Sequence, residues 1–178
     1  MRIGIDISQL AYPNVGVSNY LTSLIENMVL DNRHTFILLF SSRRGKVPLR
    51  ITKLLDRENV KLKRIRLTPS VLDMLWNRLH KIPVEKFIGS VDYFITSDWT
   101  EPPVENAQKA TILYDLVVYK YPHGTDQKII KVHKRKLKWV KKESDIIFCI
   151  SESTKKDAQD ILGIAGEKLK VVYPGFSL

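Results

Sequence analysis

The sequence contains little of what marks secreted, zinc-binding or membrane-spanning proteins. Cys149 is its single cysteine, which excludes a disulfide framework and any zinc site built from several cysteines. One cysteine fits a reducing, cytoplasmic setting. The longest compact apolar run covers residues 36–40, whereas a membrane span needs about 20 apolar residues. The start MRIGIDISQL has Asp6 where a signal peptide would be apolar, so no targeting segment is expected.

Acidic residues are scarce relative to basic ones. Lys and Arg total 29 and Asp and Glu total 19, so the formal net charge is +10 and the pI is near 9.7. Such a balance indicates an anionic partner: nucleic acid, a phospholipid surface or a nucleotide-linked substrate. Hydrophobic residues at 44% and charged residues at 27% are ordinary for a globular protein, and they exclude a disordered, collagen-like or coiled-coil chain.

Short β-branched runs alternate along the whole chain with helix-length stretches. The expected strands cover residues 3–7, 35–40, 60–67, 91–96, 110–114, 145–150 and 169–173. The expected helices cover residues 18–30, 48–57, 70–79, 84–88, 126–142 and 151–162. Several strands are apolar on both faces, as in sheets covered by helices on both sides. The pattern predicts one α/β domain, a Rossmann-like, doubly wound, mostly parallel sheet of about seven strands with helices on both faces.

The loop after the first expected strand is the first candidate for a ligand site, because ligands of such folds bind at the carboxyl ends of strands. It contains Gly16 and leads into a helix that Ser18 is expected to cap. A glycine there lets backbone N–H groups approach a phosphate. The dinucleotide fingerprint and the Walker pattern are both missing. A turn that needs glycine explains Gly16 equally well.

Two further strand ends carry polar candidates. Tyr114 and Asp115 follow the strand at 110–114, where a site residue would lie, although an Asp after a strand more often only caps the next segment. Ser151 and Glu152 follow the strand at 145–150. Ser151 could donate to a ligand oxygen and Glu152 could orient a hydroxyl, but helix capping explains this cluster without any ligand.

The helix expected at 126–142 is strongly basic. One stripe of it consists of Lys131, Lys134, Arg135, Lys138, Lys141 and Lys142, opposite a mostly apolar stripe at positions 130, 133, 137 and 140. The default interpretation is a solvated face. Anionic lipid would attract the stripe by about 1 kcal/mol per basic residue, and nucleic acid would contact it through phosphates. No nucleic-acid-binding motif accompanies it, so nucleic acid is the less favoured partner. The four histidines have no metal-ligand spacing, so no metal is expected.

Taken in order, these pieces resemble a known family. They are MRIGIDISQL at residues 1–10 with GVSNYL at 16–21, ATILYDL at 110–116, ISESTKKD at 150–157 and KLKVVYPG at 168–175. Together they resemble the N-terminal half of retaining, nucleotide-sugar-dependent glycosyltransferases of the GT-B fold, family 4 (group 1). The resemblance extends from residue 2 to residue 175, and the S-E-S-T and V-V-Y-P-G segments are its most specific parts.

The resemblance implies an enzyme of two Rossmann-like domains that face each other across a cleft. Residues 1–175 would form the N-terminal domain, which receives a glycan or lipid-linked acceptor. The loop around Gly16 would approach the phosphates or sugar of the donor. Pro174 and Gly175 would begin the crossing, continued by residues 176–178, to a C-terminal donor-binding domain that this sequence lacks. The nucleotide sugar would be a substrate, and neither a cofactor nor a metal is implied.

One position departs from the family pattern. Many relatives have His-Asp where this chain has Tyr114 and Asp115, so Asp115 matches and Tyr114 does not. A tyrosine donates a hydrogen bond but cannot act as a base near neutral pH. We expect this chain to be half of a hexosyltransferase, supplemented by a second domain in cis or in trans, and to be inactive alone. It would be cytoplasmic, or peripheral at the inner face of the plasma membrane, and would act in cell-envelope polysaccharide synthesis. The alternative is a stand-alone binding module that docks on anionic lipid or nucleic acid through the basic helix.

Overall fold

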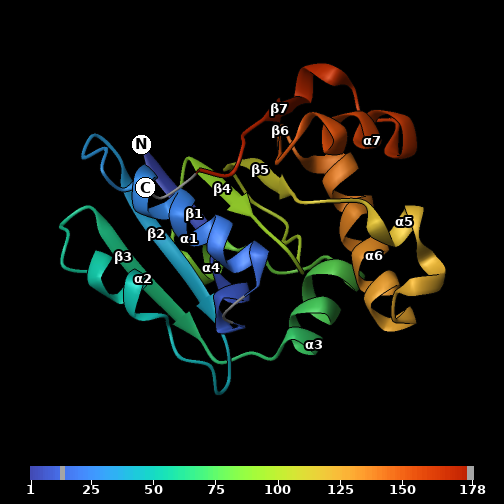
Figure 1. The fold of residues 1–178 in the computed structure, drawn as a ribbon. Coiled ribbons are helices and arrows are strands. Elements are labelled where there is room, and N and C mark those ends of the chain that lie inside the picture. The colour runs from blue at the N-terminus through green and yellow to red at the C-terminus, as the bar shows by residue number, and fades with distance from the viewer. Residues whose placement is uncertain (13–14, 176–178) are drawn as a thin grey trace.

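A computed structural model describes residues 1–12 and 15–175. One parallel sheet has the strand order β3-β2-β1-β4-β5-β6-β7 (Figure 1). Its strands are β1 (Arg2–Asp6), β2 (Thr35–Ser41), β3 (Val60–Ile65), β4 (Tyr93–Thr96), β5 (Gln108–Leu113), β6 (Ile146–Cys149) and β7 (Leu169–Val171). Each lies at a predicted position, so the predicted fold class is confirmed. The expected start of a domain crossing at residues 176–178 lies outside the described residues.

Helices fill the connections between the strands. They are α1 (Gly16–Met28), α2 (Leu49–Leu54), α3 (Pro69–Leu72), α4 (Glu85–Ile88), α5 (Val117–Lys120), α6 (Gln127–Glu143) and α7 (Glu152–Leu162). Short 3₁₀ turns are η1 (Ser8–Ala11), η3 (Pro122–Gly124) and η4 (Gly166–Lys168). The helix predicted at 70–79 is in fact α3 followed by a π-helical segment, η2 (Asp73–Arg78). The single turn of α5 was not predicted.

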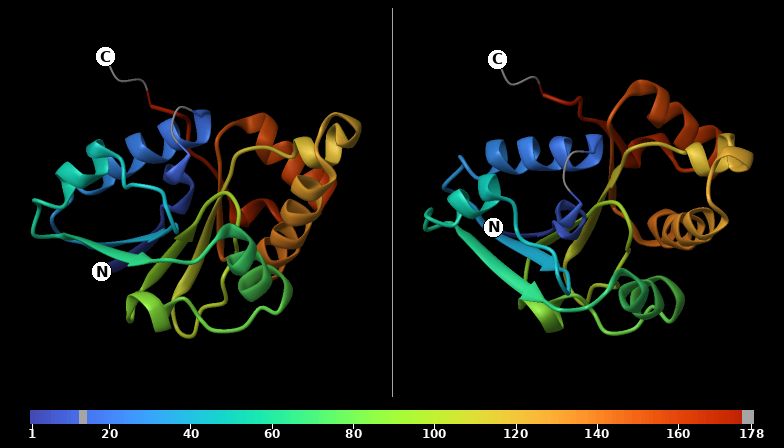
Figure 2. Two further views of the ribbon diagram at one scale, coloured as in Figure 1. Left: turned by 90° about the horizontal axis from the view of Figure 1, so that it is seen from below. Right: turned by 60° about the horizontal axis from the view of Figure 1, so that its bottom comes forward.

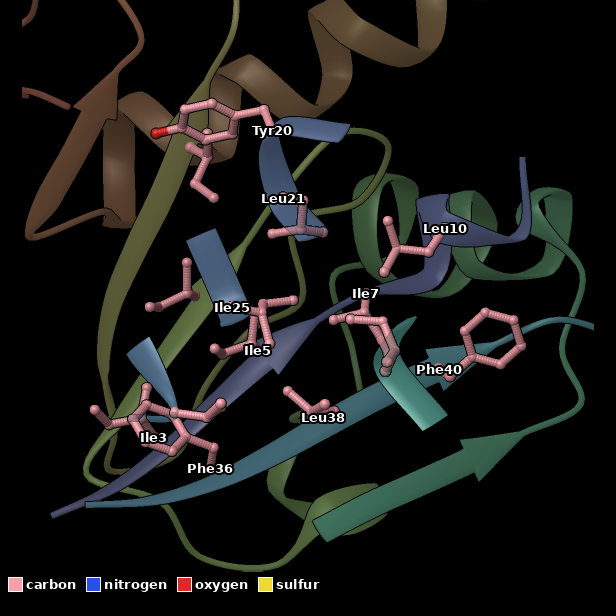
Figure 3. Packing of buried hydrophobic residues seen from close by; sticks show 14 of the residues in the cluster. Ile3, Ile5, Ile7, Leu10, Tyr20, Leu21, Ile25, Phe36, Leu38 and Phe40 are labelled. Atoms are coloured by element: carbon pink, nitrogen blue, oxygen red, sulfur yellow. The ribbon is translucent and has the colours of Figure 1, made fainter. Parts of the chain in front are cut away.

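Strand β2 shows why the sheet is covered on both faces. Phe36, Leu38 and Phe40 point to one face and pack with β1 and α1 (Figure 3). Ile37 and Leu39 point to the other face and pack with Trp76 and other residues of the α3–α4 segment. A strand with apolar residues at every position is stable only when both faces are removed from water. Helix packing on the two faces provides that environment.

The helices are divided between the faces of the sheet. Helices α1 and α2 cover β1 to β3 on one side, while α3, η2 and α4 lie on the other, as the two views of Figure 2 show. A separate apolar cluster joins α6 and α7 to β5, β6 and β7. Cys149 belongs to this cluster, and its burial raises the pKa of the thiol to about 11. A buried thiol of this kind is an unreactive core residue.

Serine side chains have different roles at the starts of α7 and α1. The Ser151 hydroxyl accepts a hydrogen bond from the Thr154 N–H at 3.1 Å and caps α7, which ends at Gly163 with a φ of 62°. The prediction that Ser18 caps α1 is wrong. The helix begins earlier, at Gly16, and the Ser18 hydroxyl donates to the Tyr12 carbonyl oxygen at 2.8 Å. Ser18 therefore ties the first turn of α1 back to the preceding loop.

We predict that Gly4→Ala lowers the free energy of unfolding by about 1–3 kcal/mol. A Cβ on Gly4 would lie 2.7 Å from Phe94 Cδ2 and 2.8 Å from Ile88 Cδ1, and both side chains are buried. Gly124→Ala is the matched control, because a Cβ there meets nothing within 4 Å. Urea denaturation followed by circular dichroism measures both variants. Equal stability of the two would contradict the close packing of α4 and β4 against β1.

Candidate functional site

A groove of about 710 Å³ opens at the carboxyl edge of the sheet. Its lining comes from the first half of α1, Arg50 of α2, the ends of β5 and β6, and the segment that follows β7. Gly16, Tyr114, Asp115, Pro174 and Gly175 all line it. Five predicted site residues that are far apart in the sequence therefore share one cavity. Parallel strands make this possible, since their carboxyl ends all lie at the same edge.

Gly16 is the first residue of α1, and a Cβ at this position would meet nothing within 4 Å. The N–H groups of the first turn of a helix have no partners within the helix. The N-terminal end of α1 thus presents backbone donors to the groove beside open space. An anion that entered there would meet these donors and the positive end of the helix dipole.

Tyr114 lines the groove, but its hydroxyl is engaged in the interior. The hydroxyl lies 2.8 Å from Ser97 Oγ and accepts from Gln9 Nε2 at 3.2 Å. The ring packs edge to face against Tyr20, with centroids 5.6 Å apart. Burial raises the pKa of Tyr114 well above its ordinary value. The side chain is therefore a neutral, fixed wall of the groove.

Asp115 is exposed at the end of β5. Its Oδ1 accepts a hydrogen bond from the Val117 N–H at 2.9 Å, so it caps α5 as one of the two sequence interpretations predicted. The same carboxylate lines the groove. Its capping role and a role toward a ligand are compatible, because one carboxylate offers two oxygens.

Ser151 and Glu152 lie just outside the groove. Ile150 lines it, but the next two residues do not. Ser151 is used as the cap of α7, and Glu152 is exposed in the first turn of that helix. The structure thus brings them near the groove without making them part of its wall.

Sequence analysis missed a buried polar layer beneath the groove. Lys136 is 3% exposed, and its ammonium donates to the Ser97 carbonyl oxygen. Burial lowers the pKa of Lys136, while the charges of Glu101, Asp98 and Asp6 act in the opposite direction. A signal existed, since Lys136 lies within one turn of His133 and Val140 on the apolar side of the helix. Through Ser97, this lysine supports the hydrogen bonds of Tyr114.

Asp98 and His133 adjoin this layer and are half-buried. Burial raises the pKa of Asp98 and lowers that of His133. Asp98 donates its backbone N–H to Gln9 Oε1 at 3.2 Å, so the loop after β4 is connected to η1. Gln9 thereby contacts both the Tyr114 hydroxyl and the β4 loop, which helps to hold Tyr114 in place beside the groove.

The basic stripe on α6 needs one correction. Lys131, Lys134, Lys138, Lys141 and Lys142 are exposed as predicted. Arg135 is not part of this free surface, because it is half-buried and its Nη2 lies 2.6 Å from Asp73 Oδ2. The π-helical turn of η2 brings Asp73 against α6, a contact between segments about 60 residues apart that no local pattern reveals. Lys134 lies over the Tyr119 ring, and Lys138 and Lys142 lie over the Trp139 ring.

Among residues 1–12 and 15–175, no group of three or more His, Cys, Asp or Glu side chains is arranged to hold a metal ion. Within the same ranges, no helix combines the length and apolar character needed to cross a membrane.

Comparison with known proteins decides the family. The sequence model of Glycosyltransferase Family 4 matches residues 15–178. The chain belongs to this family. The match begins just before Gly16 and includes Tyr114, Asp115 and Ser151, so all the residues that line the groove lie inside it. Residues 1–14, which carry the first strand and Gln9, lie outside the matched range.

Solved structures add the fold. Eleven chains match, and one is the crystal structure of a glycosyltransferase from Rickettsia africae ESF-5. The alignment has a TM-score of 0.53 at 14% identity and covers 99% of this chain. It covers 43% of the Rickettsia chain, so the present chain spans less than half of that structure. A comparison with curated protein sequences finds no significant match.

We predict that Tyr114→Phe lowers the free energy of unfolding by about 1–3 kcal/mol, because Ser97 and Gln9 lose a buried partner. Tyr121→Phe is the control, since Tyr121 is 65% exposed.

The contribution of Tyr114 to stability should also depend on pH. With the pKa of Tyr114 raised in the folded state, the unfolded state releases the proton first, so stability falls as pH rises above about 10. The free energy of unfolding, measured by urea denaturation between about pH 9 and about pH 11, should fall less steeply with pH for Tyr114→Phe than for the wild type. Identical pH slopes would show that the Tyr114 hydroxyl is not buried.

Proposed function

We propose that this chain is the acceptor-side half of a glycosyltransferase that moves a hexose from a nucleotide sugar to a glycan or lipid-linked acceptor with retention of configuration. The observation that carries the proposal is the groove in which Gly16, Tyr114, Asp115, Pro174 and Gly175 meet. Membership of Glycosyltransferase Family 4 supports the reaction class. It also favours an enzyme over the alternative of a stand-alone module for lipid or nucleic acid.

Each groove residue has a role in this proposal. The start of α1 at Gly16 donates backbone N–H groups to the donor, because a nucleotide sugar carries a diphosphate. Asp115 holds hydroxyls of the transferred sugar through the oxygen that the Val117 N–H leaves free. Tyr114 forms the apolar wall against which the sugar lies, which a neutral ring does better than a charged one. Ser151 and Glu152 contribute at the outer lip.

The chemistry requires a stabilised leaving diphosphate and an acceptor hydroxyl held on the face that the leaving group vacates. Positioning and electrostatics supply most of such a barrier. The residues of this chain orient one side of the reaction. A second domain binds the nucleotide, and it is either joined through Pro174 and Gly175 or supplied by another chain. This chain alone does not catalyse the transfer. The nucleotide sugar is a substrate, and the proposal uses no metal or other cofactor.

The acceptor is presented at the inner face of the plasma membrane, in cell-envelope polysaccharide synthesis. The stripe of Lys131, Lys134, Lys138, Lys141 and Lys142 docks on anionic lipid there. The ammonium groups of Lys138 and Lys142 lie over the Trp139 ring. Lysine side chains next to an aromatic ring suit a membrane–water interface.

The first test concerns Asp115. Asp115→Asn keeps an oxygen that accepts from the Val117 N–H but removes the charge from the groove. We expect it to lower the kcat/KM of sugar transfer at least about tenfold in the protein expressed from the complete reading frame that contains this chain. Release of nucleoside diphosphate from a panel of nucleotide sugars measures the rate. Proton NMR of the product measures the anomeric configuration.

Asp160→Asn on the exposed face of α7 is the matched control and should leave the rate unchanged. A normal rate for Asp115→Asn would mean that Asp115 only caps α5. Absence of transfer from every nucleotide sugar tested, or an inverted product, would contradict the proposed reaction.

The second test concerns the membrane. Lys134→Glu/Lys138→Glu/Lys141→Glu should abolish sedimentation of the protein with vesicles that contain phosphatidylglycerol, because each basic residue contributes about 1 kcal/mol near such a surface. Wild-type binding should weaken as salt rises and should be absent with neutral vesicles.

Lys53→Glu/Lys61→Glu/Lys63→Glu carries the same charge change at α2 and the distant edge strand β3, and it should still sediment. Equal loss of vesicle binding in both triple variants would show that binding depends on the net charge of the protein and not on the α6 stripe. Tighter retention of the wild type on DNA than on vesicles would favour nucleic acid instead.

A further inference from the structure

A second pocket, of about 480 Å³, lies between α6 and the α3–η2 segment. It shares no lining residue with the groove. Its charged wall consists of Asp73, Arg78, Lys128, Lys131 and Arg135, so four cationic side chains face one carboxylate. Of the residues that line this pocket, the proposed function uses only Lys131, as one end of the lysine stripe.

The one carboxylate in the pocket is already saturated. Asp73 accepts from Arg135 Nη2 at 2.6 Å, from Arg78 Nε at 3.1 Å and from Asn77 Nδ2 at 3.0 Å. Burial alone would raise the pKa of Asp73, but these hydrogen bonds outweigh it and hold the pKa below its ordinary value. Asp73 is therefore ionised at neutral pH, and it orients the two guanidinium groups as a fixed cationic floor.

Lys128 and Lys131 have no such partner. They form no ion pair with any residue in the described part of the chain. Residues 128, 131 and 135 are three and four positions apart on α6, which places them on one helix face, and all three line the pocket. With Asp73 balancing one of the two arginines, the pocket keeps three uncompensated positive charges. A dianionic ligand matches this excess better than a single carboxylate does.

The remaining wall of the pocket is mostly apolar, and consists of Pro69, Met74, Trp99 and Val132 together with Ser70. The Trp99 carbonyl oxygen accepts from Asn77 Nδ2 at 3.0 Å, and the Trp99 ring packs edge to face against His133 with centroids 5.2 Å apart. Met74, which is 55% exposed, lines the same pocket. A held aromatic ring next to several cations fits a ligand that has a phosphate attached to a sugar ring or to a hydrocarbon chain.

We propose that this pocket binds a phosphate group of the acceptor through Lys128, Lys131 and Arg135, with Trp99 against the adjoining part of the molecule. The word acceptor rests on the proposed function, whereas binding of a phosphate does not. Trp99 follows β4 and Tyr114 follows the neighbouring strand β5, so a ligand held in the pocket lies along the same sheet edge as the groove.

The experiment uses inorganic pyrophosphate as the probe and the indole N–H signals of the ¹⁵N-labelled chain as the readout. Trp99→Phe assigns the Trp99 signal. We expect pyrophosphate to shift that signal and to leave that of the buried Trp76 unchanged. Lys128→Gln/Lys131→Gln should weaken the apparent Kd at least about tenfold.

Lys134→Gln/Lys138→Gln is the matched control, since it removes two charges from the same helix outside the pocket. It should bind pyrophosphate as the wild type does. Equal loss in both double variants, no shift of Trp99, or an equal response to acetate at the same ionic strength would overturn the proposal.

Dihexanoyl phosphatidic acid below its micelle concentration distinguishes the source of the phosphate. Tighter binding of this lipid than of pyrophosphate assigns a lipid-borne phosphate, and the reverse order assigns a soluble one. The outcome is separable from the proposed function. Pyrophosphate binding without sugar transfer would support the phosphate pocket and contradict the proposed transferase function. Sugar transfer that is insensitive to Lys128→Gln/Lys131→Gln would support the transferase function and show that the pocket is not part of the acceptor site.

Discussion

The pairing of the buried Lys109 ammonium is the constraint on which the rest of this structure depends. Lys109 is 1% exposed, and its Nζ lies 2.8 Å from Glu143 Oε2 and 3.8 Å from Glu101 Oε1. An unpaired charge at this depth would be strongly destabilising, so β5, the loop after β4 and the end of α6 must come together. Glu101 is also buried and accepts from Thr96 and Thr111, so its charge is satisfied as well. Burial alone would raise the pKa of Glu143, but Lys109 and His80 outweigh it. This cluster sets where α6 lies on the sheet.

The position of α6 in turn decides both candidate sites. It brings Lys136 beneath the groove, where the lysine holds the Ser97 carbonyl, and Arg135 against Asp73 in the second pocket. One face of the helix is thus interior, one lines a pocket, and one is the solvent-exposed lysine stripe, which meets the pocket at Lys131. Packing therefore gives the basic residues of one helix three different environments. The parallel sheet adds the second constraint, since it places every strand end, and with them Tyr114 and Asp115, along one edge.

The candidate site was predictable where its signal was local. Gly16 before a helix, Asp115 after a strand and Ser151 before another helix are each recognisable from their neighbours, and the fold rule that ligands meet strand ends brings them to one edge. The engagement of the Tyr114 hydroxyl was not predictable, because Ser97 and Gln9 approach it from distant parts of the chain. Arg135 was misassigned for the same reason: Asp73 is about 60 residues away, on a π-helical turn that periodicity does not distinguish from an ordinary helix.

The sequence by itself determined the alternation of strands and helices, the mostly parallel class of the sheet and the chemical character of its carboxyl edge. These properties follow from hydrophobic period, glycine and capping residues, which act over a few positions. Only the tertiary structure decided which cations are free and which are consumed, how deep Lys136 and Lys109 lie, and that two separate cavities share the edge. Charge pairing and burial depend on which segments meet, and side chains that meet across 30 to 60 residues leave no pattern in the order of the amino acids.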